Sequence, residues 1–123
     1  MVVDTSALIA IFLNEPDAEI LSATLAASFP RIISTVSVLE ASIVMESKKG
    51  EAGLALLDEL IAAAQFEIVA FDDAQYRIAR EAYRHYGKGR HPAGLNFGDC
   101  CSYSPARATT PCYSRAVISQ NLT

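Results

Sequence analysis

Three short apolar segments, each followed directly by a longer segment with helical character, constrain the fold most strongly. The segments are MVVD at residues 1–4, RIIS at residues 31–34 and FEIVAF at residues 66–71. They are too short for amphipathic helices and rich in β-forming residues, which is typical of buried strands. Because parallel strands require long crossover connections, this alternation predicts an α/β fold with a parallel sheet.

Turn and capping residues indicate where the helices begin and end. Thr5 or Ser6 can start a helix that runs to about Leu13, and Pro30 stops a second helix that begins near Pro16. Gly50 should end the helix that follows RIIS, and another helix should precede FEIVAF. The last clear helix is expected from about residue 74 to residue 86, with Asp72 and Asp73 as caps and Gly87 as its stop.

Length and composition limit the class of protein. A chain of 123 residues with 51% apolar and 20% charged residues suits one packed domain. The net charge of −4 argues against bulk-charge binding of nucleic acid, so such a role needs a local basic patch. The sequence has no basic leader, no apolar run that could span a bilayer, and three cysteines without disulfide or zinc spacing. We therefore expect a cytoplasmic protein.

Three carboxylates occupy positions where parallel strands end or soon after. Asp4 ends the first strand, Glu40 lies one to two turns into the helix after the second strand, and Asp99 follows a glycine-rich loop. Ligands of open parallel sheets bind at the carboxyl ends of strands, so these acids could meet at one edge. Hard cations such as Mg²⁺ and Mn²⁺ prefer carboxylate oxygens. The pattern indicates a candidate metal site, and with it hydrolysis of a phosphodiester.

Each of these acids also has a purely structural interpretation. Asp4 can cap the helix that follows it. Glu40 stands three residues after Ser37, which is the spacing of a capping box. Asp99, beside Gly98, can cap a helix as well. The residues alone do not decide between capping and metal binding.

Basic residues cluster in the second half of the chain. Arg77, Arg80, Arg84 and Lys88 recur at helical spacing, which suits either a phosphate track or a solvated helix face. The loop GKGRHP carries Lys88, Arg90 and His91 close to Asp99 in sequence. These three residues are candidates for holding a polyanion beside the acidic site.

Taken together, these segments resemble the PIN-domain ribonucleases, and among them the VapC-type toxins of bacterial toxin–antitoxin pairs. The matching motifs are MVVDTSALIAIFLNEPDA, STVSVLEASIV and YGKGRHPAGLNFGDC, spread over residues 1 to about 100. A receiver-like phosphoacceptor would need an acidic pair after the first strand, and a haloacid-dehalogenase phosphatase would need D-x-D where Ser6 stands. Both are therefore disfavoured.

The resemblance implies a three-layer α/β/α domain and an endoribonuclease that depends on Mg²⁺ or Mn²⁺. It assigns Asp4, Glu40 and Asp99 to the metal and the catalytic site, with Ser6 as a supporting hydroxyl. It also implies an RNA substrate, a homodimer, and a cognate antitoxin that covers the active-site groove.

The chain departs from the family pattern after Cys100, so we expect a PIN-like domain at residues 1–100 and an atypical tail at residues 101–123. The family continues with a strand such as PLLFKG and then an Asp followed by Phe. Read in the neighbouring frame, codons for CYSRAVIS at residues 112–119 are compatible with LFKGxDF. Our hypothesis is a reading-frame shift just after Asp99 or Cys100, which the nucleotide sequence would test.

Such a shift would remove a fourth acid and a late strand that lies beside the first one. We expect weaker metal binding, an unpaired edge on the first strand and lower stability, unless residues such as RAVIS replace part of the strand. Three carboxylates could still hold one Mg²⁺, which commonly keeps several waters. The alternative function is a weakened or inactive PIN-like module that binds antitoxin or dimerises.

Overall fold

The computed structural model describes residues 1–89, 92–101 and 112–113, the last two by their backbone alone. Along the chain its elements are β1 (Val2–Val3), α1 (Thr5–Phe12), α2 (Ala18–Ala26), β2 (Ile32–Ser34), α3 (Thr35–Ala63), β3 (Glu67–Val69), α4 (Asp73–Tyr86) and β4 (Cys112–Tyr113). A short helix at residues 97–101 precedes β4.

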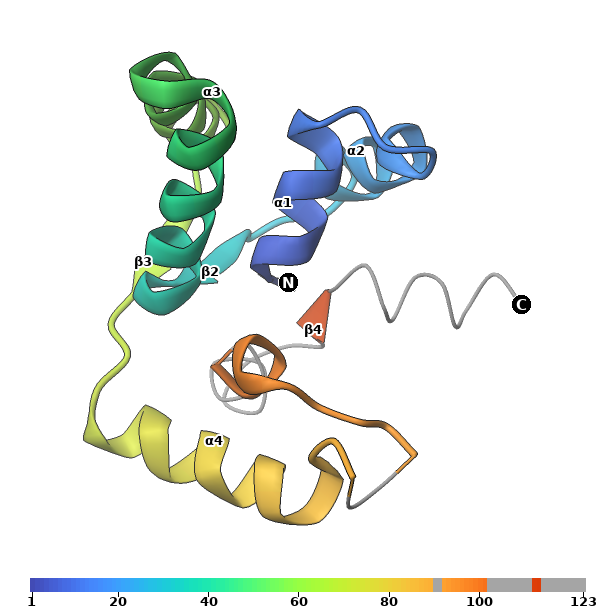
Figure 1. The fold of residues 1–123 in the computed structure, drawn as a ribbon, viewed down its shortest axis with the longest axis vertical. Coiled ribbons are helices and arrows are strands. Elements are labelled where there is room, and N and C mark those ends of the chain that lie inside the picture. Colours follow the sequence, from blue (N-terminus) through green and yellow to red (C-terminus); the bar gives the residue numbers. More distant parts are fainter. Residues whose placement is uncertain (90–91, 102–111, 114–123) are drawn as a thin grey trace.

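The four strands form one parallel sheet in the order β3-β2-β1-β4. Helices α1, α2 and α3 lie on one side of the strands, and α4 with the 97–101 helix lies on the other (Figure 1). The predicted α/β fold with a parallel sheet is therefore confirmed. The expected strands and helices all form, with ends that differ by a few residues.

The main hydrophobic core lies between the sheet and the first three helices. Val3 and Ile33 come from the two central strands, while Leu8, Leu21 and Met45 come from α1, α2 and α3. All five side chains are no more than 1% exposed. Burial of this much aliphatic surface is the main force that holds β1 against β2, and it places the end of β1 at the start of α1.

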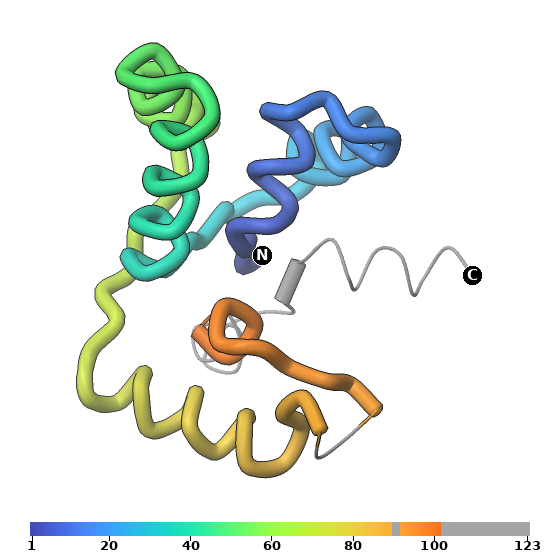
Figure 2. The backbone as a smooth tube through the Cα atoms, in the orientation of Figure 1, coloured from blue at the N-terminus to red at the C-terminus, as the bar shows by residue number. Residues whose placement is uncertain are grey.

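A second, smaller cluster joins α4 to the 97–101 helix. Ala79 and Ala82 of α4 pack with Cys100, and Phe71 and Leu95 cover them in part. The loop between the two helices is closed at its base, where the Lys88 backbone N–H donates to the Leu95 carbonyl over 2.9 Å. Figure 2 shows how α4, the loop and the 97–101 helix follow one another along the side of the sheet away from α1.

The first strand does not have the open edge that the tail had led us to expect. Val2 pairs with Cys112 and Val3 pairs with Tyr113 in parallel register. The pairing residues are not the RAVIS segment, which lies outside the described residues. The expectation of an unpaired edge was wrong, because a backbone segment of almost any sequence can supply the amide groups that a strand edge needs.

Helix α3 contains two helical halves that are interrupted only at Gly50. Gly50 has φ of +62° and ψ of −150°, a region that essentially only glycine adopts. The predicted stop at Gly50 is thus a break between two helical halves. No helix within the described part of the chain has the length and apolar character needed to cross a membrane.

Candidate active site

Asp4 lies at the joint between β1 and α1, and its side chain is almost fully buried. The carboxylate is 4% exposed, and its Oδ1 accepts a 2.6 Å hydrogen bond from the Ser6 hydroxyl. The same oxygen accepts a longer bond of 3.3 Å from the Ala7 backbone N–H, which makes Asp4 the N-cap of α1. The predicted capping role of Asp4 is therefore present in the structure.

Burial makes the negative charge of Asp4 costly in the protein without a bound cation. The pKa of Asp4 is raised from 3.8 to about 6, chiefly by desolvation and to a smaller extent by the nearby Asp99 carboxylate. The hydrogen bonds from Ser6 and Ala7 oppose these effects. A carboxylate that is buried next to another carboxylate is typical of a site that binds a cation or a proton.

Asp99 and Asn96 cap the 97–101 helix reciprocally. The Asp99 backbone N–H donates to Asn96 Oδ1 over 2.9 Å, and the Asn96 backbone N–H donates to Asp99 Oδ2 over 3.0 Å. Asn96 is thus the N-cap, and Asp99 takes part in the cap from a position three residues later. This capping box holds the Asp99 carboxyl group in a defined orientation.

The capping interpretation of Glu40 is wrong. Ser34 caps α3, and its side chain accepts a 3.3 Å hydrogen bond from the Val36 N–H. Ser37 lies inside the first turn of the helix and is 2% exposed. Glu40 instead approaches the 97–101 helix. A Cβ atom placed on Gly98 would lie only 3.2 Å from Glu40 Oε2.

The three acids line one small cavity of about 60 Å³. They reach it from the end of β1, from α3 and from the 97–101 helix. The remaining lining residues are Thr5, Ser6, Asn96 and Gly98. The tertiary structure therefore brings Asp4, Glu40 and Asp99 to the same place from points far apart in the sequence.

The donor set of this cavity fits a hard divalent cation. Carboxylate, amide and hydroxyl oxygens line it, and these are the ligands that Mg²⁺ and Mn²⁺ prefer. Across the described ranges, no three acidic, histidine or cysteine side chains are drawn together tightly enough to form a complete metal cluster. Carboxylates repel one another when no cation lies between them, so the acidic side chains should lie farther apart in the metal-free protein than around a bound ion.

The predicted RNA-binding residues are placed only in part. Lys88 is exposed and lies at the base of the loop, where its backbone bonds to Leu95, the residue before Asn96. Arg90 and His91 lie outside the described residues. Lys88 does not line the acidic cavity.

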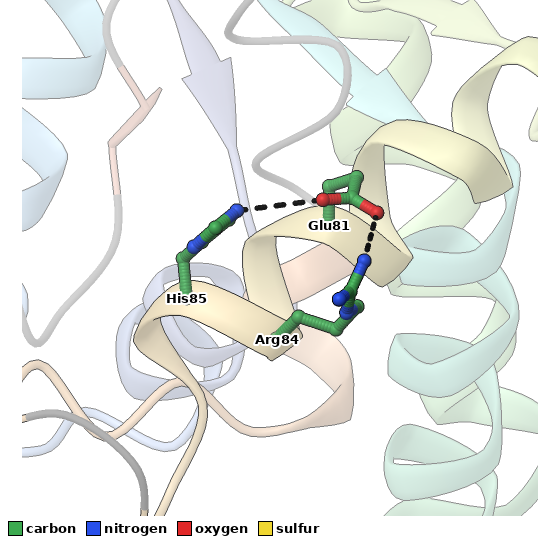
Figure 3. A network of polar contacts seen from close by, with 3 residues as sticks. All are labelled: Glu81, Arg84 and His85. Carbon is green, nitrogen blue, oxygen red and sulfur yellow. Dashed lines mark hydrogen bonds and ion pairs between the residues drawn. The ribbon is translucent and has the colours of Figure 1, made fainter.

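The basic stripe of α4 divides into two parts. Arg84 and His85 both lie against Glu81, at 3.0 Å and 3.4 Å, in a solvent-exposed group (Figure 3). Arg84 lowers the pKa of Glu81. Arg77 and Arg80 instead lie over the ring of Tyr76, with 5.3 Å and 5.5 Å between each guanidinium carbon and the ring centroid.

Three cavity residues were not predicted from the sequence as site residues. Thr5 follows Asp4 in the sequence and Gly98 precedes Asp99, while Asn96 directly precedes the helix that carries Asp99. The spacing of Asn96 and Asp99 is that of a capping box, which could have identified Asn96. No sequence pattern could have revealed that Gly98 faces Glu40 from another element.

Comparison with known proteins gives consistent matches. The PIN domain family matches residues 1–110. Ribonuclease VapC of Mycolicibacterium smegmatis is 52% identical over 109 residues, which cover 89% of this chain and 84% of that protein. Two proteins of Mycobacterium tuberculosis are also similar. Ribonuclease VapC30 is 50% identical over 87% of this chain and 82% of its own, and Ribonuclease VapC28 is 47% identical over 86% and 80%.

Proposed function

Because the chain belongs to the PIN-domain family, as a VapC-type ribonuclease, we propose that it hydrolyses RNA phosphodiester bonds with Mg²⁺ or Mn²⁺ at the acidic cavity. The observation that carries this proposal is the convergence of Asp4, Glu40 and Asp99 on one cavity. Each comes from a different element, and the capping interpretation of Glu40 fails.

Five residues of the cavity have proposed roles. Asp4, Glu40 and Asp99 would hold the metal directly or through water. Ser6 keeps Asp4 ionised, because its hydroxyl donates to the charged carboxylate. Asn96 orients Asp99 through the reciprocal cap. When bound, the metal supplies a Lewis acid that polarises the phosphate and lowers the pKa of the attacking water.

Lys88, Arg90 and His91 are proposed to position the RNA backbone. Lys88 is an exposed cation at the base of a loop that leads directly to Asn96. Phosphate contacts from such residues fix the register of RNA without reading its bases. Their substitution should weaken RNA binding in a salt-dependent way.

A matched pair of variants on α3 tests the catalytic assignment. Glu40→Gln keeps the size of the side chain and removes its charge inside the cavity. Glu46→Gln makes the same change on an exposed part of the same helix. We expect Glu40→Gln to reduce Mg²⁺-dependent RNA cleavage on the order of 100-fold or more and Glu46→Gln to leave it unchanged. Equal activity of both variants would refute the proposal.

The proposed partners are a cognate antitoxin and a second copy of the chain, and the proposed compartment is the cytoplasm. Leu39 and Ile43 stand one turn apart on α3 and are 62% and 59% exposed, which supports an apolar contact surface. Leu39→Lys should shift a dimer to a monomer in sedimentation velocity. Co-purification with an antitoxin and loss of RNA cleavage in that complex would test the other partner.

A further inference from the structure

A second cavity lies on the other side of the 97–101 helix from the acids. Its volume is about 400 Å³, and four of its eight lining residues are aromatic. Phe71 comes from the segment before α4, Tyr76 and Tyr83 come from α4, and Phe97 comes from the 97–101 helix. Phe97 is 72% exposed, and both tyrosines are more than one-third exposed.

This aromatic pocket is separated from the acidic cavity by the width of one short helix. Gly98 and Asp99 line the acidic cavity, while Phe97, Cys100 and Cys101 line the aromatic pocket. A helix is roughly 10 Å across with its side chains, so the two sites lie within reach of adjacent nucleotides of one strand.

Positive charge borders the pocket on the α4 side. Arg80 is part of its wall, and the guanidinium groups of Arg80 and Arg77 both lie over the Tyr76 ring. Aromatic faces combined with cations are the elements with which proteins bind unpaired nucleotides, since rings stack on bases and cations attract phosphates. An RNA strand matches both features and continues into the proposed catalytic site.

We infer that the pocket formed by Phe97, Tyr76 and Tyr83 binds an unpaired base of the RNA substrate next to the scissile phosphate. This inference rests on the proposed ribonuclease function and defines its substrate as RNA with an unstacked nucleotide beside the cut. The pocket wall is almost wholly apolar, so it holds the base by stacking and discriminates little between bases.

Binding measurements with Phe97→Leu test the inference. Leucine keeps the apolar character and removes the ring, so it separates base stacking from general apolar contact. Phe29→Leu is a matched control, because Phe29 is 70% exposed at a distance in sequence from the pocket and also lies beside an arginine, Arg31. The probe is a short fluorescent single-stranded RNA, measured by anisotropy in EDTA, together with the same RNA carrying abasic riboses.

We expect Phe97→Leu to bind the normal RNA about 5- to 150-fold more weakly than the wild type does. On abasic RNA the two proteins should bind equally, because there is no base to stack. Phe97→Trp should retain binding, and Phe29→Leu should behave as the wild type. Circular dichroism should show that the variants stay folded, since Phe97 is exposed.

Three results would overturn the inference: unchanged binding of normal RNA by Phe97→Leu, an equal loss on abasic RNA, or no RNA binding by the wild type. A change in sedimentation or in antitoxin capture by Phe97→Leu, with RNA binding unchanged, would assign the pocket to a protein partner instead. Cleavage with Mg²⁺ is a separate measurement. Ring-dependent binding without cleavage would support base binding by the pocket and refute the ribonuclease function on which its place beside a scissile phosphate rests. Cleavage without ring-dependent binding would support the ribonuclease function and refute the base pocket.

Discussion

The hydroxyl of Ser6 donates a 2.6 Å hydrogen bond to Oδ1 of Asp4, two residues before it. This bond stabilises the charged form of a carboxylate whose pKa burial raises to about 6. Near neutral pH the protein therefore keeps a buried negative charge ready for a cation, at a cost in stability when no cation is bound.

Ser6→Ala should move the pH dependence of RNA cleavage to higher pH. Without the donated hydrogen bond the pKa of Asp4 rises further, so protons compete with the metal over a wider range. We expect the Mg²⁺ concentration for half-maximal activity at neutral pH to rise by roughly 10-fold. Ser42→Ala is the control, because the Ser42 hydroxyl bonds within α3 to the Val38 carbonyl. A shift of equal size in Ser42→Ala would contradict the prediction.

Asp4→Asn should abolish cleavage and stabilise the metal-free protein at neutral pH. Asparagine Oδ1 can still accept from Ser6 and Ala7, while the buried charge is gone. Because the pKa of Asp4 is higher in the folded state than its usual value of 3.8, the folded state binds more protons between pH 4 and 6. The wild type should therefore lose up to about 3 kcal/mol from this group as pH rises through that window.

Urea denaturation in EDTA at a series of pH values measures this effect. The difference in unfolding free energy between Asp4→Asn and the wild type should grow from pH 4 to pH 6 and then level off. Taking the difference removes the contribution of the other carboxylates. A difference that stays constant with pH would show that Asp4 titrates normally.

Gly98→Ala should impair metal binding without unfolding the protein. The new methyl group would lie 3.2 Å from Glu40 Oε2, so the carboxylate has to shift. Alanine in place of glycine also favours the helix, by about 1 kcal/mol. We expect a higher dissociation constant for Mn²⁺ in calorimetry and an equal or higher melting temperature. Lower stability with unchanged Mn²⁺ affinity would count against the proposed contact.

Removal of residues 102–123 should destabilise the chain by exposing the edge of β1. Val2 and Val3 are buried and pair with β4, so their backbone groups would lose these partners. We expect a lower melting temperature and more light scattering on heating. A chain that ends after Tyr113 keeps β4 and is the matched control. Equal melting temperatures of the two truncated chains would show that the β4 pairing contributes little.

Local sequence signals determined the elements of this protein. Short β-branched runs, the cap at Asp72 and the glycine at position 50 act over a few residues, so they can be read along the chain. The position of Asp4 at the end of a strand could also be predicted from the sequence. Strands that alternate with helices form a parallel sheet, and the carboxyl ends of parallel strands lie at one edge.

Only the tertiary structure decided which role Glu40 takes. The sequence offered Ser37 as its capping partner, but α3 begins at Thr35, so Ser37 is already inside the helix. In the structure Ser34, the last residue of β2, is the N-cap of α3. Glu40 then faces Gly98 across elements, a contact without any local signature.

The pairing of β1 with β4 and the aromatic pocket were likewise outside the reach of the sequence. Cys112 and Tyr113 have no strand pattern of their own, and they pair because the buried edge of β1 requires backbone partners. Phe97 and Tyr76 line the same pocket, whose wall includes Ala79 and Cys100 packed in one cluster. The chain by itself determined its strands, helices and acidic residues; long-range packing, which satisfies backbone groups and buries apolar surface, decided how they meet.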